Sequence, residues 1–202
     1  MCFLPGKHMG KMVILGVTPG VWQVVVFLIL SAGLAYVSRA ALRRPGAHGF
    51  WRFFAWEAIL GLFLLNVEHW FDDPFSLRQM ISWSFLVVSG FLVLHAVYIL
   101  HRYGRPVEQR GDEALIAFEK TSQLVTQGLY AYIRHPMYSS LLFLAWGIFC
   151  KAPGWVGGVL AAATTCLLVA TARADEAECT RFFGSVYLDY KKQTRMFIPG
   201  LF

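Results

Sequence analysis

Charged residues are scarce in this sequence. Only 15% of its 202 residues are Asp, Glu, Lys or Arg, and 57% are hydrophobic. Water-soluble domains usually carry about 25% charged residues, so an ordinary soluble domain is excluded. The net charge of +6 does not indicate a nucleic-acid-binding face, because the basic residues fall in short segments between apolar runs. That distribution is typical of membrane loops, and the sequence predicts an integral membrane protein.

Cysteine is also rare, and its spacing is uninformative. Cys2, Cys150, Cys166 and Cys179 form no CxxC pair and no Cys/His ligand set, so we expect neither a disulfide nor a metal. No Gly-x-Gly-x-x-Gly stretch follows a predicted strand, which excludes the soluble Rossmann type of cofactor site. Internal repeats and low-complexity tracts are lacking as well.

Long apolar runs are present instead. A hydrocarbon core requires roughly 20 helical residues, and runs at about 21–38, 50–71 and 81–100 are long enough. A further region, about 137–172, is broken by the turn residues of "KAPGW" and is predicted to form a helical hairpin. The predicted fold is therefore all-α, with about five transmembrane helices.

The basic residues also predict an orientation. Segments 39–52, 101–136 and 173–202 hold four, five and five Lys or Arg residues, fourteen of the eighteen in the chain. We therefore expect these segments and the C-terminus in the cytoplasm and the N-terminus outside, in the cytoplasmic membrane if the protein is bacterial. The first long apolar run lacks a convincing cleavage site and is expected to remain as an anchor.

A motif rich in charge and aromatic rings precedes the hairpin. It is "GLYAYIRHPMY", residues 128–138, and its Pro136 predicts the start of a helix. A helix from there to Lys151 is about 24 Å long, short of a core of about 30 Å, so Arg134 and His135 lie at or inside the interface. One interpretation is that these residues only anchor the helix, as interfacial cations and tyrosines commonly do.

A second polar segment, "DEAECTRFFGSVYLDYKKQTRMFIP", follows the last span. From Glu176 to Tyr190 its apolar positions recur at helical spacing, which predicts a C-terminal amphipathic interfacial helix. Asp175 and Glu176 form an acidic pair on the side that carries Arg134 and His135. Basic, acidic and aromatic groups are thus expected to converge at one depth.

Together the two segments resemble a known family. "LVTQGLYAYIRHPMY" followed by "DEAECTRFFGSVYLDYKK" and "FIP" is similar to the isoprenylcysteine carboxyl methyltransferases and their bacterial relatives, kin of the phospholipid N-methyltransferases. The resemblance covers roughly residues 80–202. It implies a membrane enzyme that transfers a methyl group from S-adenosylmethionine to a lipid-like or prenyl-like acceptor, with carboxyl O-methylation favoured. Residues 81–202 would form the catalytic core, and 1–80 an N-terminal pair of transmembrane helices.

The resemblance also implies which residues act. Arg134 and Arg173 are candidate catalytic residues. The cofactor would be bound by Ser122, Gln123, Leu124, Val125, Tyr130, His135, Pro136, Met137, Tyr138, Asp175 and Glu176. Tyrosine faces suit a sulfonium cation, and carboxylates suit hydroxyl and ammonium groups. The chain departs from the family at Asp175, Ser140 and Thr171, where Glu, Gly and, in the eukaryotic enzymes, Arg are common; the last change counts against a prenylcysteine carboxylate.

Several functional alternatives stay open at this point. The expected partners are the lipid bilayer and a lipophilic small-molecule acceptor, without nucleic acid or metal. The chain could instead be a phospholipid amine N-methyltransferase, a non-enzymatic multi-span binding or transport protein, or a membrane reductase using a nicotinamide cofactor. Spacing alone assigns the role of base to neither His135 nor Glu176.

Overall fold

The structure is a computed structural model that describes residues 19–104 and 123–200. Within these ranges it is entirely helical apart from loops and one isolated parallel bridge between Ile133 and Arg195. Five apolar helices dominate: α1 (Val21–Val37), α3 (His48–Asn66), α4 (Leu77–Tyr103), α5 (Pro136–Phe149) and α6 (Trp155–Phe183). Shorter elements are α2 (Arg39–Leu42), α7 (Ser185–Gln193), η1 (Val67–His69) and η3 (Gly128–Ala131). The all-α prediction is confirmed.

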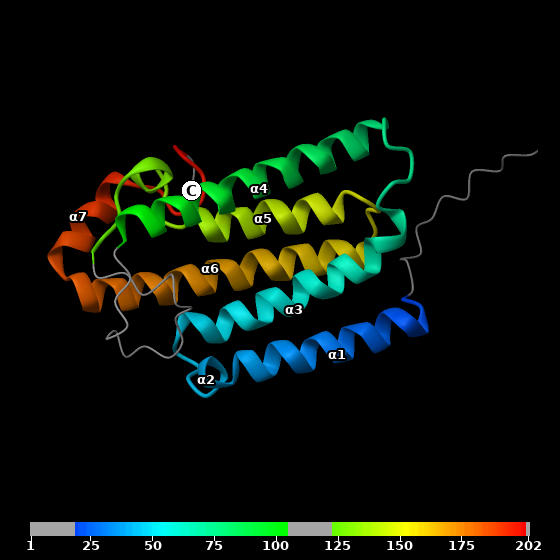
Figure 1. Cartoon of the computed structure of the whole chain (residues 1–202), viewed down its shortest axis with the longest axis horizontal. Coiled ribbons are helices and arrows are strands. Elements are labelled where there is room, and N and C mark those ends of the chain that lie inside the picture. The colour runs from blue at the N-terminus through cyan, green and yellow to red at the C-terminus, as the bar shows by residue number, and fades with distance from the viewer. Residues whose placement is uncertain (1–18, 105–122, 201–202) are drawn as a thin grey trace, which may run out of the picture.

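The five helices lie side by side and alternate in direction. Across the bundle their order is α1, α3, α6, α5, α4, with the closest packing between α3 and α6 and between α4 and α5 (Figure 1). The starts of α3 and α5 therefore meet the ends of α4 and α6 at one end of the bundle, which also carries α7 and the C-terminal segment. We call this the site end, and the opposite one the far end.

The outer surface of the bundle suits lipid. Three helical segments are long and apolar enough to cross a membrane: His48–His69, Leu77–Tyr103 and Trp155–Phe183, while α1 and α5 are shorter apolar helices. Large apolar side chains such as Leu28, Phe91 and Leu94 are exposed on them, a surface that a soluble monomer rarely presents. The protein is thus an integral membrane protein. Its orientation and the division at residue 80 stay predictions.

A buried lysine holds the far end together. Lys151, in the turn between α5 and α6, is fully buried. Its Nζ donates to Gln79 Oε1 at 2.9 Å and lies 3.6 Å from the centroid of the Trp83 ring and 5.0 Å from that of Trp70. Hydrogen bonding and cation–π contacts compensate the buried ammonium. The hairpin turn is therefore fixed to α4 and to Trp70, which directly follows η1.

The helix predicted at Pro136 is confirmed, with the proline in its first turn. With 14 residues α5 is about 21 Å long, and α4 with 27 is about 40 Å. The two pack closely along their length. Ser82 and Ser89 of α4 donate to the carbonyls of Gly147 and Ser140 at 2.7 and 2.8 Å. These bonds fix α5, and with it the motif at its start.

The C-terminal helix is present but begins later than predicted. Asp175 and Glu176 lie inside α6, which continues to Phe183. The chain turns at Gly184, where φ is +62°, and α7 follows from Ser185. Only glycine adopts such a φ at little cost, so the helix breaks there. The predicted continuous helix from Glu176 to Tyr190 is corrected to two helices.

Candidate active site

Backbone hydrogen bonds join the motif to the C-terminal segment. The N–H groups of Arg134 and His135 donate to the carbonyls of Arg195 and Met196 at 2.7 and 3.2 Å. In the opposite direction, the Arg195 N–H donates to the Tyr132 carbonyl at 3.0 Å. The motif before α5 and the chain after α7 therefore form one unit.

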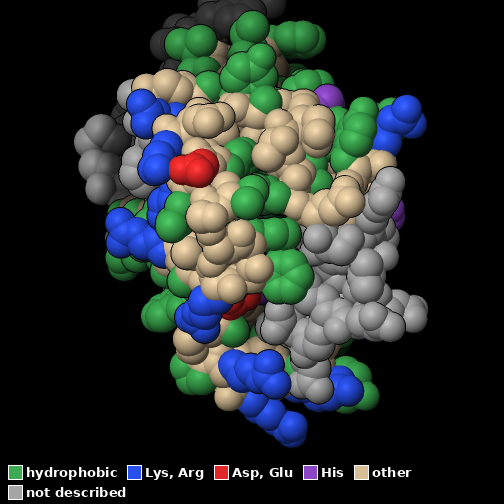
Figure 2. Space-filling view, turned by 90° about the vertical axis from the view of Figure 1, so that its left-hand side faces the viewer, with side chains coloured by type: hydrophobic (Ala, Val, Ile, Leu, Met, Phe, Trp, Pro, Cys, Tyr) green, Lys and Arg blue, Asp and Glu red, His purple; other side chains and the backbone are tan. Residues whose placement is uncertain are grey.

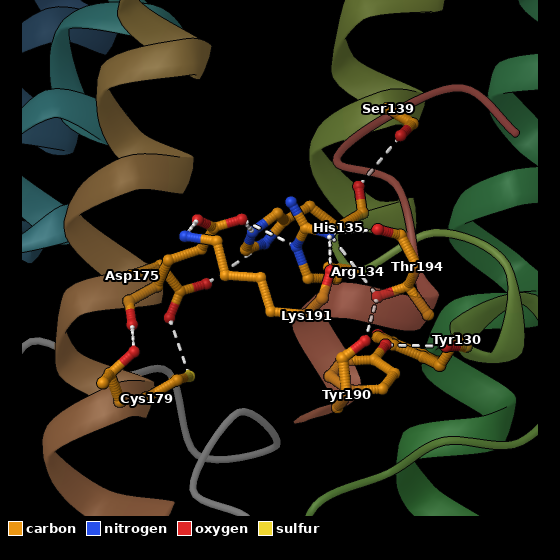
Figure 3. Close-up of polar contacts among 11 residues, drawn as sticks. Tyr130, Arg134, His135, Ser139, Asp175, Cys179, Tyr190, Lys191 and Thr194 are labelled. Atoms are coloured by element: carbon orange, nitrogen blue, oxygen red, sulfur yellow. Dashed lines mark hydrogen bonds and ion pairs between the residues drawn. The ribbon is translucent and has the colours of Figure 1, made fainter. Parts of the chain in front are cut away.

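Glu176 is the centre of a charge cluster with Arg134, His135 and Lys191, which Figure 3 labels. Its side chain is 5% exposed, and its Oε1 accepts from Arg134 Nε at 2.7 Å. The ammonium of Lys191 pairs with Oε2. Arg134 also donates through Nη1 to the Lys191 carbonyl at 3.2 Å and to the Thr194 carbonyl. Arg134 thus links α6, the motif and the end of α7.

His135 lies between the two acidic residues. Its Nδ1 is 3.5 Å from Asp175 Oδ2, and its Nε2 is 3.5 Å from Glu176 Oε1. The ring is buried and stacks on Tyr138 with centroids 5.4 Å apart. Burial alone would lower the pKa of His135, but its contacts with Asp175 and Glu176 outweigh burial and raise the pKa above the ordinary value. The protonated ring is therefore more stable here than in an ordinary histidine.

This raised pKa predicts a pH dependence of stability. A protonated His135 stabilises the fold fully below the ordinary histidine pKa of about 6.5, and the stabilisation is lost as pH rises through the raised pKa. We expect the difference in unfolding temperature between wild type and His135→Gln, measured in detergent, to be largest near pH 6 and to shrink at higher pH. A difference that stays constant with pH would contradict the charged contact.

A cavity of about 120 Å³ opens beside this cluster at the site end. Most of the predicted residues line it: Leu124, Val125, Tyr130, Arg134, His135, Pro136, Met137, Tyr138 and Asp175. Glu176 and Arg173 instead line a second recess of about 590 Å³, with Arg134 and Lys191. Gln123 is exposed and outside the cavity wall, and Ser122 lies outside the described residues.

Two residues that the sequence did not single out face each other at the cavity wall. His48, the first residue of α3, is 1% exposed. Its Nδ1 is 2.8 Å from Glu178 Oε2, and its backbone N–H donates to Glu178 Oε1 at 2.9 Å. The only local signal was that Glu178 follows Asp175 by three residues, which places both on one helix face. No spacing connects residues 130 positions apart.

Two tyrosines of α7, Tyr187 and Tyr190, also line the cavity and were not predicted. Burial raises the pKa of both phenols well above the usual value, so both stay neutral. The Tyr190 hydroxyl donates to the Tyr130 carbonyl at 2.6 Å. The C-terminal helix thus forms part of the cavity wall.

Three potential metal ligands come together here. One atom each of His48, Asp175 and Glu178 lie within 4.8 Å of one another. Both oxygens of Glu178 already accept hydrogen bonds from His48. Hydrogen bonds therefore account for the closeness of His48 and Glu178 without a metal ion. The expected absence of a metal stays a prediction.

The site end is basic on its outside. Figure 2, which views this end, shows more Lys and Arg than Asp and Glu side chains. Exposed members include Arg43, Arg44, Arg181, Lys192 and Arg195. Such a rim suits the anionic headgroups of a cytoplasmic leaflet, in line with the predicted orientation.

Comparisons with known proteins show that the chain is similar to methyltransferases. The family model described as "Phospholipid methyltransferase" matches residues 77–185, more than half of the chain. Methanethiol S-methyltransferase of Pseudomonas deceptionensis is 26% identical over 72% of this chain and 48% of its own length. Methanethiol S-methyltransferase 2 of Bradyrhizobium diazoefficiens is 28% identical over 45% of this chain and 36% of its own length.

The chain thus spans half or less of the length of these curated relatives. No solved structure matches it significantly. The matched region includes α4, the motif, α5 and α6, and so covers Arg134, His135, Asp175 and Glu176. The expected kinship with isoprenylcysteine and phospholipid methyltransferases is confirmed. With its all-helical membrane fold and this paired motif, the chain belongs to the phospholipid methyltransferase family.

Proposed function

We propose that the protein is an S-adenosylmethionine-dependent methyltransferase that acts on an apolar acceptor dissolved in the bilayer. The observation that carries this proposal is the cavity in the family-matched region, which Tyr130, Tyr138 and Asp175 line together. Bound there, S-adenosylmethionine would supply an electrophilic methyl group on a sulfonium cation. Aromatic rings and carboxylates are the groups that stabilise cationic ligands.

The size of the cavity bears on how the cofactor enters. About 120 Å³ is well below the roughly 300–1,000 Å³ of ordinary ligand pockets. Tyr187 and Tyr190 belong to α7, which begins directly after the turn at Gly184. The space around Gly184 is open, because a Cβ added there would have no neighbouring atom within 4 Å. We therefore propose that α7 moves about Gly184 to admit the cofactor from the cytoplasmic side.

An apolar hollow on the bundle surface offers a route for the acceptor. It has a volume of about 430 Å³ and is lined by residues of α4, α5, α6 and the C-terminal segment, among them Phe85, Ser139, Trp146 and Phe197. Its inner end adjoins the site, because Ser139 Oγ donates to the His135 carbonyl at 3.0 Å and the Phe197 ring centroid is 6.2 Å from that of His135. A lipophilic acceptor would approach His135 from this side.

The chemistry of the acceptor belongs to this proposal. Carboxyl O-methylation, which the family resemblance implies, stays a prediction. The Arg134 guanidinium is not free for an acceptor carboxylate, because it contacts Glu176 and backbone carbonyls. Arg173, exposed in the second recess, is the remaining candidate for an anionic group. The family description favours an amine on a phospholipid, and the names of the two relatives favour a thiol.

Calorimetry on the purified full chain in detergent tests the proposal. We expect S-adenosylhomocysteine to bind and NADPH not to bind. Transfer of a labelled methyl group should then be measured to three acceptors: methanethiol, phosphatidylethanolamine in vesicles and a prenylcysteine. Binding of NADPH alone would favour a reductase, and binding of neither ligand would return the motif to the role of a membrane anchor.

A further inference from the structure

The His48–Glu178 pair leaves one ring nitrogen of His48 unpaired. Nε2 of His48 is buried and has no hydrogen-bond partner among the described residues. A buried unpaired nitrogen costs free energy comparable to a lost hydrogen bond, so its presence in a cavity wall calls for a partner that arrives from outside. We infer that His48, oriented by Glu178, accepts the proton of a protic acceptor, a thiol or an amine. This inference rests on the proposed function.

The geometry is that of an oriented base. The carboxylate of Glu178 lies 2.8 Å from Nδ1 and favours the tautomer that carries its proton there, which leaves a lone pair on Nε2. The second oxygen of Glu178 accepts the His48 backbone N–H at 2.9 Å, so the carboxylate is fixed as well. A carboxylate bound to one ring nitrogen also stabilises the imidazolium that forms when the other nitrogen takes a proton.

The other titratable groups at the cavity are less suited to this role. Both ring nitrogens of His135 lie 3.5 Å from carboxylate oxygens, whereas the ion pair of His48 engages its Nδ1. Tyr187 and Tyr190 are neutral hydroxyls. The charged groups that act on His48 are Asp175 and Glu178 of α6 and Arg52 of its own helix. Two ring nitrogens at the cavity wall lack a hydrogen-bond partner among the described residues, Nε2 of His48 and Nε2 of His135, and that of His135 already has a carboxylate oxygen of Glu176 at 3.5 Å.

The step balances without a further reactant. With a thiol acceptor, the S–H proton passes to His48 Nε2 as the acceptor sulfur forms its new bond to the methyl carbon. The bond from that carbon to the donor sulfur breaks, and its electron pair stays on the donor, which becomes neutral. His48 later releases the proton to water. An amine loses one proton in the same way, whereas a carboxylate acceptor is already ionised and needs no base.

The variant His48→Asn tests the inference. Its amide can still donate to Glu178, but nothing replaces Nε2. We expect methyl transfer to methanethiol or to phosphatidylethanolamine to fall about 100-fold, the lower range for loss of a general base, while S-adenosylhomocysteine binding is unchanged. The matched control is His69→Asn at the far end, where Nδ1 lies 2.8 Å from Asp72 in an exposed pair. This control should leave transfer unchanged.

Thiol acceptors of different acidity distinguish a role of His48 as a base from a purely structural role. In His48→Asn the loss should be smaller for an acidic aromatic thiol than for methanethiol, and should shrink as pH rises, because a thiolate needs no base. Histidine ¹⁵N spectra give a readout independent of turnover. Above the pH at which His48 titrates, they should show an unprotonated Nε2 in the wild type and a mixture of tautomers in Glu178→Gln.

Four results would overturn the inference. They are normal transfer in His48→Asn, an equal loss for all thiols at every pH, methylation of the prenylcysteine carboxylate alone, or an activity that a chelator removes and a divalent metal restores. The thiol and amine arms of the assay identify the acceptor class. Failure of the wild type to bind S-adenosylhomocysteine would instead refute the proposed function itself.

Discussion

Replacing Glu176 by glutamine should lower the free energy of unfolding by about 3–5 kcal/mol, the usual cost of removing one partner from a buried ion pair. Arg134 and Lys191 contact its two oxygens, and His135 lies 3.5 Å away. Glutamine keeps the size of the side chain but leaves these cations without their shared carboxylate. Reversible denaturation in mixed micelles measures the change.

The matched control is Glu68→Gln, an exposed glutamate in η1 at the far end. Its effect should stay within about 0.5 kcal/mol, as for most surface substitutions. If both variants unfold at the same denaturant concentration, Glu176 does not hold the site end together.

Arg134→Lys should reduce methyl transfer about 100-fold while the protein still inserts into the membrane, since small displacements of catalytic groups cost that much. The guanidinium contacts Glu176 through Nε and two backbone carbonyls through Nη1. A single ammonium cannot reproduce this planar set of donors. The side chain that holds Glu176 and the end of α7 in fixed relative positions would then be lost.

Arg195→Lys is the control for this change. Arg195 lies in the C-terminal segment that pairs with the motif, but its side chain is exposed. Turnover and S-adenosylhomocysteine binding should be measured in parallel for both variants. Normal turnover in Arg134→Lys would mean that the motif serves only as an interfacial anchor.

The helices themselves could be predicted from the sequence. Long apolar runs, the break at "KAPGW" and Pro136 placed the five apolar helices, because length and hydropathy decide what crosses a bilayer. The turn at Gly184 could not be predicted. Its neighbours keep a helical pattern of apolar residues, and a glycine inside such a pattern is often tolerated. Only the positive φ at this residue shows that the chain changes direction.

The site was predictable where two short polar segments, expected on the same side of the membrane, supplied its residues. Arg134, His135 and Asp175 were expected at one depth, and they line one cavity. The pairing of His48 with Glu178 joins α3 to α6 and depends on how the helices pack, which no local pattern encodes. The first two spans carried no motif, yet α3 contributes this buried histidine to the wall.

The short α5 has a consequence for the surrounding membrane. Its 14 residues span about 21 Å beside a neighbour of about 40 Å, in a bilayer whose hydrocarbon is about 30 Å thick. Where α5 reaches the bundle surface, at Trp146, we expect neighbouring lipids to shorten or tilt, which would thin the leaflet locally. Headgroups and water would then lie closer to the bilayer centre, which would shorten the path of the proposed acceptor's polar end to the site. Acyl-chain length in the host membrane thereby becomes a determinant of how readily the site is reached.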